Sequence, residues 1–197
     1  RAGDYEVAIA GGVESMSRAP FIMPKADTAF SRSNQIFDTT IGWRFINPKI
    51  EASFGVDSMP ETADNVASEY KVSKADQDAF ALRSQQRWAA ADAAGIFANE
   101  ILPVHIEQQR GNTIVIDQDE HPRPKTSLEK LNKLDGISGP KSTVTAGNAS
   151  GVNDGAAALL LASKKGLETH GLKSIARILG VAAAGVAPRI MGIGPVP

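Results

Sequence analysis

A loop of small residues followed directly by an apolar run constrains this chain more than any other feature. Residues 143–155 read TVTAGNASGVNDG, with three glycines, and Ala156–Ala162 is apolar throughout. Asn148 and Asn153 are expected to shape this loop by tolerating left-handed backbone geometry. We expect Asp154 to cap a helix over 156–162, whose free N–H groups suit phosphate or carbonyl oxygens. From the residues alone, this loop is either a tight connection or a ligand-binding edge. Neither alternative identifies a reaction.

Strand signals occur at both ends of the chain and near its middle. Residues 5–10 alternate and then meet Gly11, which predicts a strand entering a tight turn. Residues 101–106 and 113–116 predict two strands joined by a polar turn. A further strand, rich in small apolar residues, is expected over 175–184.

Helix signals fill the space between these strands. Pro60 suits the first turn of one helix, and Ser73 is expected to cap the next, which ends before Gly95. Leucines at helical spacing predict a short helix over 128–134. The helix after Ser73 is expected to carry a modest apolar stripe made of Ala79, Leu82, Gln86, Ala89 and Ala90.

Composition is that of an ordinary globular protein. The chain has 197 residues, is 42% hydrophobic and carries a net charge of −1. That charge gives no electrostatic case for nucleic acid or an anionic membrane as a partner, and the longest apolar run is far too short to span a bilayer. The absence of cysteine agrees with a reducing compartment. We predict a cytoplasmic protein, with an organellar matrix as the alternative.

The exact residue sequence of several segments is more informative than the secondary structure that they predict. Ala146–Ala158 closely resembles the signature segment of the thiolases, which exchange acyl groups between coenzyme A thioesters. Three further segments resemble thiolase segments in the family's order, namely Gly11–Ser17, Asp76–Gln85 and Gly192–Pro197. The resemblance covers essentially the whole chain.

The resemblance implies an α/β fold: a partial, thiolase-like layered αβαβα core with an inserted α-rich loop domain. Residues 1–20 would begin the N-terminal core, residues 21–140 would form the covering loop domain, and residues 141–197 would return to the core. It also implies that the chain is an internal part of a longer enzyme and that it forms a homo-oligomer through the core.

Four binding residues follow from the resemblance, each with a plainer alternative. Ser150 would contact the pantetheine arm of coenzyme A, or it caps the turn. Ala146 would line the same tunnel. Arg123 would lie near the nucleotide end, where a guanidinium suits phosphate or a stacked adenine, or it is a solvated loop arginine. Met59 would line the acyl pocket, where its thioether adapts to a variable chain, or it fills a core.

Some positions depart from the family pattern or invite other chemistry. Ser58 stands where many thiolases have histidine, and 136–139 stands where a phenylalanine is common. Asp119–Arg123 gathers carboxylates, an imidazole and a guanidinium, but neighbours on an extended chain point to opposite faces. We therefore predict no metal site and no catalytic residue there, and a structural role for His121.

Cysteine decides what this chain can do alone. Thiolases use one cysteine as nucleophile and a second as proton shuttle, and these 197 residues contain none. We therefore predict a segment of an acyltransferase that cleaves 3-oxoacyl-CoA, with coenzyme A as co-substrate, no permanently bound cofactor and no activity of its own. The alternatives are a non-catalytic module that binds coenzyme A thioesters or a partner protein, and a structural fragment.

Two segments indicate which acyl chain the substrate carries. Residues 38–48 and 188–192 look more like thiolases acting on 3-oxoadipyl-CoA than like the acetoacetyl-CoA type. A terminal carboxylate on such a substrate needs a donor, for which Arg44 is the hypothesis, with a surface arginine as the alternative.

Overall fold

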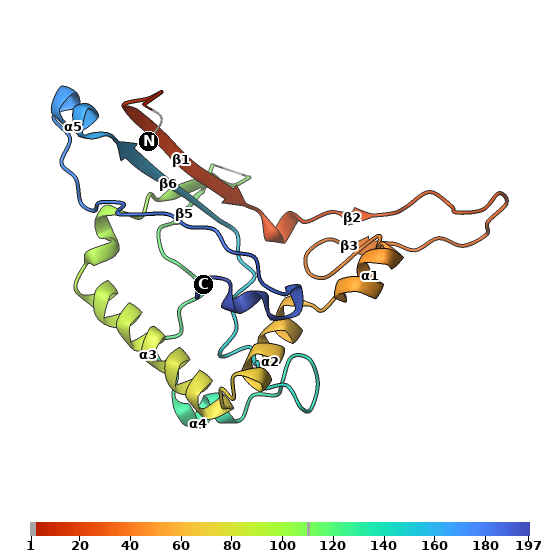
Figure 1. Cartoon of the computed structure of the whole chain (residues 1–197). Coiled ribbons are helices and arrows are strands. Elements are labelled where there is room, and N and C mark those ends of the chain that lie inside the picture. The colour runs from red at the N-terminus through yellow and green to blue at the C-terminus, as the bar shows by residue number, and fades with distance from the viewer. Residues whose placement is uncertain (1–2, 110) are drawn as a thin grey trace. The chain divides into compact units, whose positions relative to one another are not determined.

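The computed structural model describes residues 3–109 and 111–197 and contains both helices and strands. The chain divides into two compact units (Figure 1). The first unit consists of residues 3–56, 152–187 and 193–197, and the second of residues 57–109, 111–151 and 188–192. The predicted functional division at residues 20 and 140 stays a prediction.

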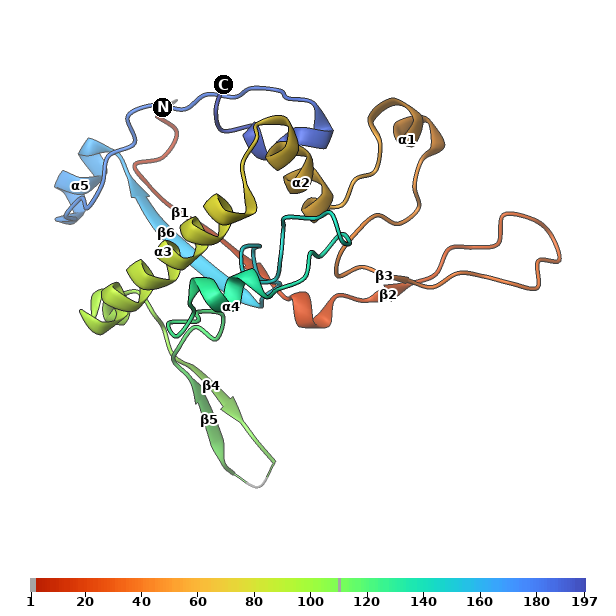
Figure 2. The ribbon, with the colours of Figure 1, turned by 90° about the horizontal axis from the view of Figure 1, so that it is seen from below.

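The first unit is built on one antiparallel pair of long strands. Strand β1 (Val7–Glu14) pairs with β6 (Gly155–Ala162) in a register that sets Val7 opposite Ala162 and Glu14 opposite Gly155. The two arrows lie side by side in Figures 1 and 2. Each residue of one strand has a partner in the other along the whole length.

This pairing corrects two predictions. The run over 156–162 is a strand, not a helix, because an apolar run of this length fits either element and the partner β1 decides between them. Asp154 therefore caps no helix, and its carboxylate instead accepts hydrogen bonds from the backbone N–H and hydroxyl of Ser17. Those bonds, the hydroxyl's first, hold the pKa of Asp154 below its ordinary value.

Gly11 continues the strand instead of turning it. It lies opposite Ala158, and a Cβ at this position would come within 2.6 Å of the Ala157 carbonyl oxygen. The glycine is therefore needed for the close approach of two backbones within the ladder, and β1 runs on to Glu14.

The rest of the first unit is short elements and loops. Its elements are η1 (Met16–Arg18), β2 (Phe21–Ile22), β3 (Phe37–Asp38), α1 (Pro48–Phe54) and α5 (Lys164–His170). Strands β2 and β3 pair at the base of a long arm (Figure 2). The strand expected over 175–184 is absent, because the described chain offers this segment no strand ladder to join.

The second unit is mainly helical, and its helices start where expected. Helix α2 (Met59–Glu69) has Pro60 in its first turn and a capping box, in which the Ser58 N–H donates to Glu61 Oε2 at 2.6 Å. Helix α3 (Lys74–Ala93) begins at Ser73, whose hydroxyl accepts from the Asp76 N–H. Gly95 follows with a φ of 70°, as the left-handed residue that closes such a helix.

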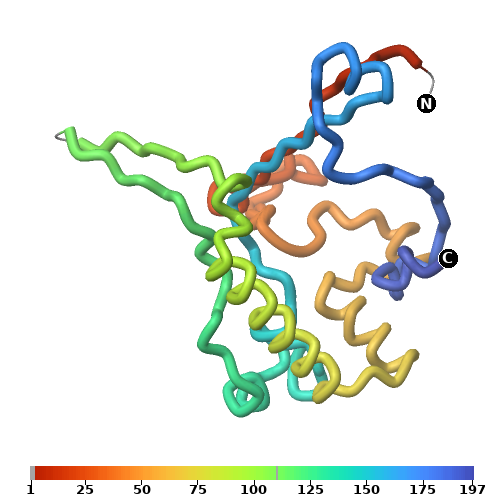
Figure 3. Tube along the Cα trace, turned by 90° about the vertical axis from the view of Figure 1, so that its left-hand side faces the viewer, coloured from red at the N-terminus to blue at the C-terminus, as the bar shows by residue number. Residues whose placement is uncertain are grey.

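Further elements of this unit follow α3. They are η2 (Ile96–Asn99), the antiparallel hairpin of β4 (Val104–Glu107) and β5 (Thr113–Ile116), α4 (Leu128–Asn132) and most of η3 (Pro188–Ile193). The hairpin confirms the predicted strand pair and projects from the helices in Figures 2 and 3. Helix α4 lies beside α3 in all three views, and confirms the predicted short helix.

A small core of the second unit lies where α2, α3, α4 and residues 144–145 meet. Its buried members are Thr62, Ala67, Asp78, Leu131, Val144 and Thr145. The predicted stripe of α3 is only partly right: Leu82 and Ala89 are half-buried, but Ala79, Gln86 and Ala90 are exposed. The inward face also carries polar residues such as Asp78, which a search for apolar spacing passes over.

No helix within the described residues is long and apolar enough to cross a membrane.

Candidate functional site

The small-residue loop is held at its start by a carboxylate from α2. Asp64 Oδ1 accepts hydrogen bonds from the backbone N–H groups of Thr143 at 2.8 Å and Val144 at 3.3 Å. Partial burial raises the pKa of Asp64, but hydrogen bonds from Ser142, Thr143 and Val144 together outweigh it and hold the pKa below its ordinary value. Asp64 is therefore an anionic acceptor for the loop backbone.

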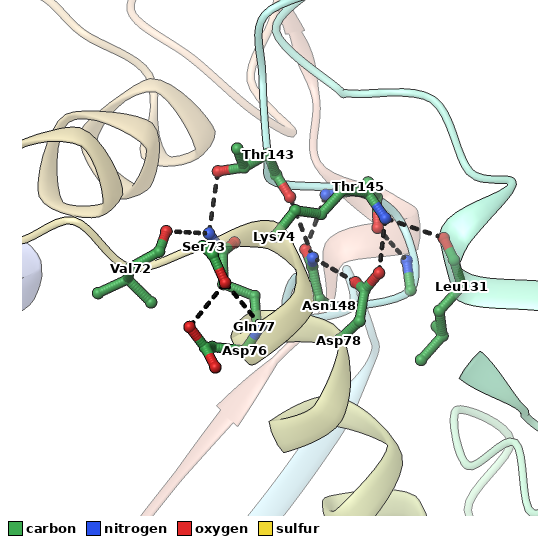
Figure 4. Close-up of polar contacts among 11 residues, drawn as sticks. Val72, Ser73, Lys74, Asp76, Gln77, Asp78, Leu131, Thr143, Thr145 and Asn148 are labelled. Carbon is green, nitrogen blue, oxygen red and sulfur yellow. Dashed lines mark hydrogen bonds and ion pairs between the residues drawn. The ribbon is translucent and has the colours of Figure 1, made fainter. Parts of the chain in front are cut away.

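Asn148 folds the loop back on itself (Figure 4). Its Oδ1 accepts from the Thr145 N–H at 2.7 Å, and its Nδ2 donates to the Thr143 carbonyl at 3.1 Å and to Asp78 Oδ1 at 3.0 Å. Neither Asn148 nor Asn153 has a positive φ, so the prediction of left-handed geometry is wrong. Asn148 shapes the loop through its side chain, as asparagine often does in turns.

Gly147 brings the loop backbone against α4. A Cβ at this position would overlap the side-chain methyls of Leu131 and Leu134. The glycine thus permits the close approach that small residues predict, and what it approaches in this structure is the protein's own leucine pair. Its N–H donates to Thr145 Oγ1 at 3.2 Å.

A pocket of about 330 Å³ lies at this junction in the second unit. The α3 and α4 helices, the 121–126 loop and the small-residue loop all contribute to its wall. The lining residues are Gln85, His121, Arg123, Thr126, Lys130, Leu131, Leu134, Ala146, Gly147 and Ala149. The pocket therefore combines an apolar wall with cationic groups, a combination that suits a ligand with both anionic and apolar parts.

Arg123 lines the pocket and is folded onto its own loop. Its Nη1 donates to the carbonyl oxygens of Glu120, His121 and Pro122 at 2.5, 2.9 and 3.0 Å. Its backbone N–H donates to Gln85 Oε1 at 2.7 Å, which ties this loop to α3. The side chain is exposed, and no Asp or Glu among the described residues forms an ion pair with it.

The pocket brings together some predicted residues and leaves others out. Ala146 and Arg123, 23 positions apart in the sequence, share its wall. Ser150 is exposed and follows the lining residue Ala149 without lining the pocket itself. Met59 is 63% exposed at the start of α2 and lies outside the lining as well. Their predicted roles stay predictions.

Sequence reasoning missed Lys130 and Gln85 as lining residues. Lys130 and Leu134 are four positions apart, so the expected helix already placed them on one face. The Lys130 Nζ donates to the Lys125 carbonyl at 2.8 Å. Nothing local marks Gln85, because only the packing of α3 against the 121–126 loop gives it this place.

The remaining candidates lie elsewhere. Arg44 is an exposed residue of the first unit, and its Nη1 donates to the Gly42 carbonyl at 2.9 Å. In the segment that departs from the family pattern, Gly136 forms an isolated bridge with Thr145. Across residues 3–109 and 111–197, no three His, Cys, Asp or Glu side chains gather closely enough to hold a metal ion, and this includes 119–123.

Comparison with known proteins defines the class. The family described as "Thiolase, N-terminal domain" matches residues 1–165, so the chain belongs to the thiolase family. Solved structures agree on the fold. Human mitochondrial 3-ketoacyl-CoA thiolase in complex with CoA is 39% identical with a TM-score of 0.78, over 98% of this chain and 46% of that one. The acetyl-CoA acetyltransferase of Bacillus anthracis is 37% identical with a TM-score of 0.81, over 98% of this chain and 47% of that one. The predicted α/β thiolase fold is confirmed.

Relatives in sequence point to one group within the family. The beta-ketoadipyl-CoA thiolase of Pseudomonas putida is 67% identical over 99% of this chain and 48% of its own length. The 3-oxoadipyl-CoA/3-oxo-5,6-dehydrosuberyl-CoA thiolase of Escherichia coli K12 is 58% identical over 100% of this chain and 49% of its own. The chain thus spans about half the length of the curated relatives it matches. Its predicted likeness to 3-oxoadipyl-CoA thiolases is confirmed.

Proposed function

We propose that this chain is the part of a thiolase-type acyltransferase that binds coenzyme A and covers the active site. The proposal rests on the 67% identity to a beta-ketoadipyl-CoA thiolase, which extends over 99% of the chain. The pocket supports it, because the signature loop and Arg123 contribute to one wall. The enzyme cleaves a 3-oxoacyl-CoA, releases acetyl-CoA and passes the shortened acyl group to coenzyme A.

The chemistry of the pocket fits the nucleotide half of the co-substrate. Arg123 and Lys130 supply positive charge for phosphate oxygens, and Leu131 and Leu134 supply an apolar surface for an adenine. In this proposal Ala146 lines the tunnel and Ser150, just beyond the pocket, bonds the pantetheine arm. Met59 contacts the acyl chain from the start of α2.

The reaction also needs a thiolate, which attacks the 3-oxo carbonyl and keeps the acyl group as a thioester after the carbon–carbon bond breaks. The 197 residues contain no cysteine. The proposed role of this chain is therefore to bind coenzyme A and to cover the active site. We expect the purified chain to cleave neither acetoacetyl-CoA nor 3-oxoadipyl-CoA.

The lack of cysteine also favours a second candidate, a thiolase-like module that binds coenzyme A thioesters without reacting. Both candidates bind coenzyme A. They separate on the intact gene product: thiolysis that disappears after thiol alkylation supports the enzyme, and tight binding without any turnover supports the module.

Binding is tested by calorimetry of the 197-residue chain with two ligands. Coenzyme A should bind, and Arg123→Ala should weaken it while leaving pantetheine, which lacks the nucleotide, unchanged. Lys125→Ala is the matched control, a cation of the same loop that does not line the pocket. No binding of coenzyme A to the parent chain, or equal losses for Arg123→Ala and Lys125→Ala, would contradict the proposed site.

For the acyl group we propose a dicarboxylic 3-oxoacyl chain, with Arg44 as the donor to its free carboxylate. In the intact gene product Arg44→Ala should lower kcat/KM for 3-oxoadipyl-CoA and not for acetoacetyl-CoA. Arg32→Ala, another exposed arginine of the first unit, should change neither. An unchanged ratio of the two substrates in Arg44→Ala would remove Arg44 from the proposal.

We also propose that the protein self-associates through the β1–β6 pair. Exposed apolar side chains of this ladder, such as Ile9, Val13 and Leu159, support the idea, because a large apolar surface favours association. Light scattering after gel filtration should give a mass above 20.8 kDa, and Ile9→Lys should reduce it.

A further inference from the structure

Asp78 is a charged residue with no exposed surface. It lies on the inward face of α3, where its relative exposure is 0%. A buried carboxylate is costly unless a charge and hydrogen bonds compensate it. Asp78 has both: Lys74 Nζ lies 2.6 Å from Oδ2, and Asn148 Nδ2 lies 3.0 Å from Oδ1 (Figure 4).

The two partners of Asp78 lead to the two sides of the pocket. Lys74 Nζ also donates to the Leu131 carbonyl at 3.1 Å, which connects the network to α4. Asn148 belongs to the small-residue loop and holds its first residues through Thr143 and Thr145. The carboxylate of Asp78 is thus the point at which α3, α4 and the loop are joined.

The pocket wall depends on this junction. Ala146, Gly147 and Ala149 come from the loop beside Asn148, and Lys130, Leu131 and Leu134 come from α4 and the residues after it. Asp78 itself does not line the pocket. Any effect it has on a ligand therefore passes through the position of the loop and of α4.

We propose that Asp78 is a positioning residue for the coenzyme A pocket, acting through Asn148 on residues 145–149. The inference rests on the proposed function of this pocket. The ion pair with Lys74 orients the carboxylate, and a carboxylate oxygen holds the Asn148 amide more strongly than a neutral acceptor would. These bonds then fix the distance between the loop backbone and the side chains of Leu131 and Leu134.

The test is a double-mutant cycle on the 197-residue chain with coenzyme A as the probe, measured by calorimetry at a temperature where every variant is folded. Asp78→Ala and Asn148→Ala should each weaken coenzyme A by about tenfold, an ordinary size for coupled neighbours. Because both cut the same link, the double variant should bind no more weakly than either single variant.

Asp76→Ala is the matched control. It removes a carboxylate two positions away on the same helix, which accepts a hydrogen bond from the Ser73 hydroxyl and lies outside the pocket. It should leave the affinity unchanged. If Asp78→Ala does not fold, Asp78→Asn takes its place, since it keeps the shape and removes the charge that Lys74 requires.

Amide hydrogen exchange of the unliganded chain reports the tether without any ligand. In Asp78→Ala the N–H groups of Thr145 and Gly147 should exchange at least about tenfold faster, while those of α5 in the first unit should not change. This arm keeps the two proposals apart: a parent chain that binds no coenzyme A ends the proposed function, and the exchange rates still decide whether Asp78 holds the loop.

Three results would overturn the inference. In one, Asp78→Ala leaves exchange in residues 145–149 unchanged. In another, exchange rises but coenzyme A binds as tightly as before. In the last, the losses of the two single variants add in the double variant, which would mean that Asp78 does not act through Asn148.

Discussion

The two units of this chain differ in what stabilises each of them internally. The first unit rests on a backbone ladder between β1 and β6, whose apolar side chains are mostly exposed: Ile9 is 78% and Leu160 is 56% exposed. The second unit surrounds a small core in which three buried positions, Thr62, Asp78 and Thr145, are polar. Backbone pairing needs only compatible strands, whereas a polar core needs particular side chains at particular places. The second unit should therefore be far more sensitive to single substitutions.

The largest effect is expected for Lys74→Met. It leaves Asp78 buried without its cation, which costs about 3–5 kcal/mol in unfolding free energy. Urea unfolding followed by Trp88 fluorescence in a Trp43→Phe background measures the second unit. Lys133→Met, which removes an exposed partner of Glu129 at the same spacing, is the control and should cost less than about 1 kcal/mol. Equal costs would show that the buried pair is no different from a surface pair.

The same substitution in both units makes the comparison direct. Leu131→Ala empties a site that is 3% exposed and should cost about 2–5 kcal/mol. Leu160→Ala in the first unit, at a 56% exposed site, should cost less than about 1 kcal/mol. Urea unfolding of each variant is the measurement, followed by Trp88 fluorescence for Leu131→Ala and by Trp43 fluorescence in a Trp88→Phe background for Leu160→Ala. A Leu160→Ala loss as large as that of Leu131→Ala would mean that the exposed ladder is covered in solution.

Gly147→Ala probes how tightly the loop lies against α4. The new methyl meets the side chains of Leu131 and Leu134, and because Leu131 is buried it has little room to move. Overpacking of this kind should cost about 1–3 kcal/mol. Gly12→Ala, where a Cβ meets nothing within 4 Å, should change the unfolding free energy by no more than about 0.5 kcal/mol. Urea unfolding measures both variants. If Gly147→Ala left the unfolding free energy unchanged, the loop would not be packed tightly against α4.

The smallest effect is expected for Asp64→Asn, and it should depend on pH. The folded-state pKa of Asp64 lies below its ordinary value, so the unfolded chain binds the proton more readily. Its stabilisation is therefore complete above about pH 5 and is lost as the pH falls below about 4. The difference in unfolding free energy between the parent and Asp64→Asn should be about 1 kcal/mol at pH 7 and shrink in acid. A difference that grows in acid would reverse the assigned sign.

Local signals predicted much of the second unit. The capping residue Ser73, the first-turn Pro60 and the closing Gly95 lie where expected, and so do the hairpin and α4. Each of these signals acts within about one turn of chain, so neighbouring residues suffice to reveal it. The inward face of α3 was misplaced because its central residue is a carboxylate, and apolar spacing does not report a buried charge.

The candidate site was predicted in part, and by resemblance more than by physics. Ala146 and Arg123 do share a pocket, but Gln85 and Lys130 join them only because α3, α4 and two loops meet. Asn148 was recognised as a residue that shapes the loop, yet its means of doing so depends on Asp78, 70 positions away.

The amino-acid sequence by itself determined the family, the starts of α2 and α3 and the residues of the small loop, because these depend on adjacent positions. Only the tertiary structure decided that 156–162 is a strand, that Asp78 is buried beside Lys74, and that the loop forms one wall of a pocket. The reason is the same in each case. An apolar run, a carboxylate or a glycine takes its role from the partner it meets, and here the partners β1, Asn148 and Leu131 are distant in the chain.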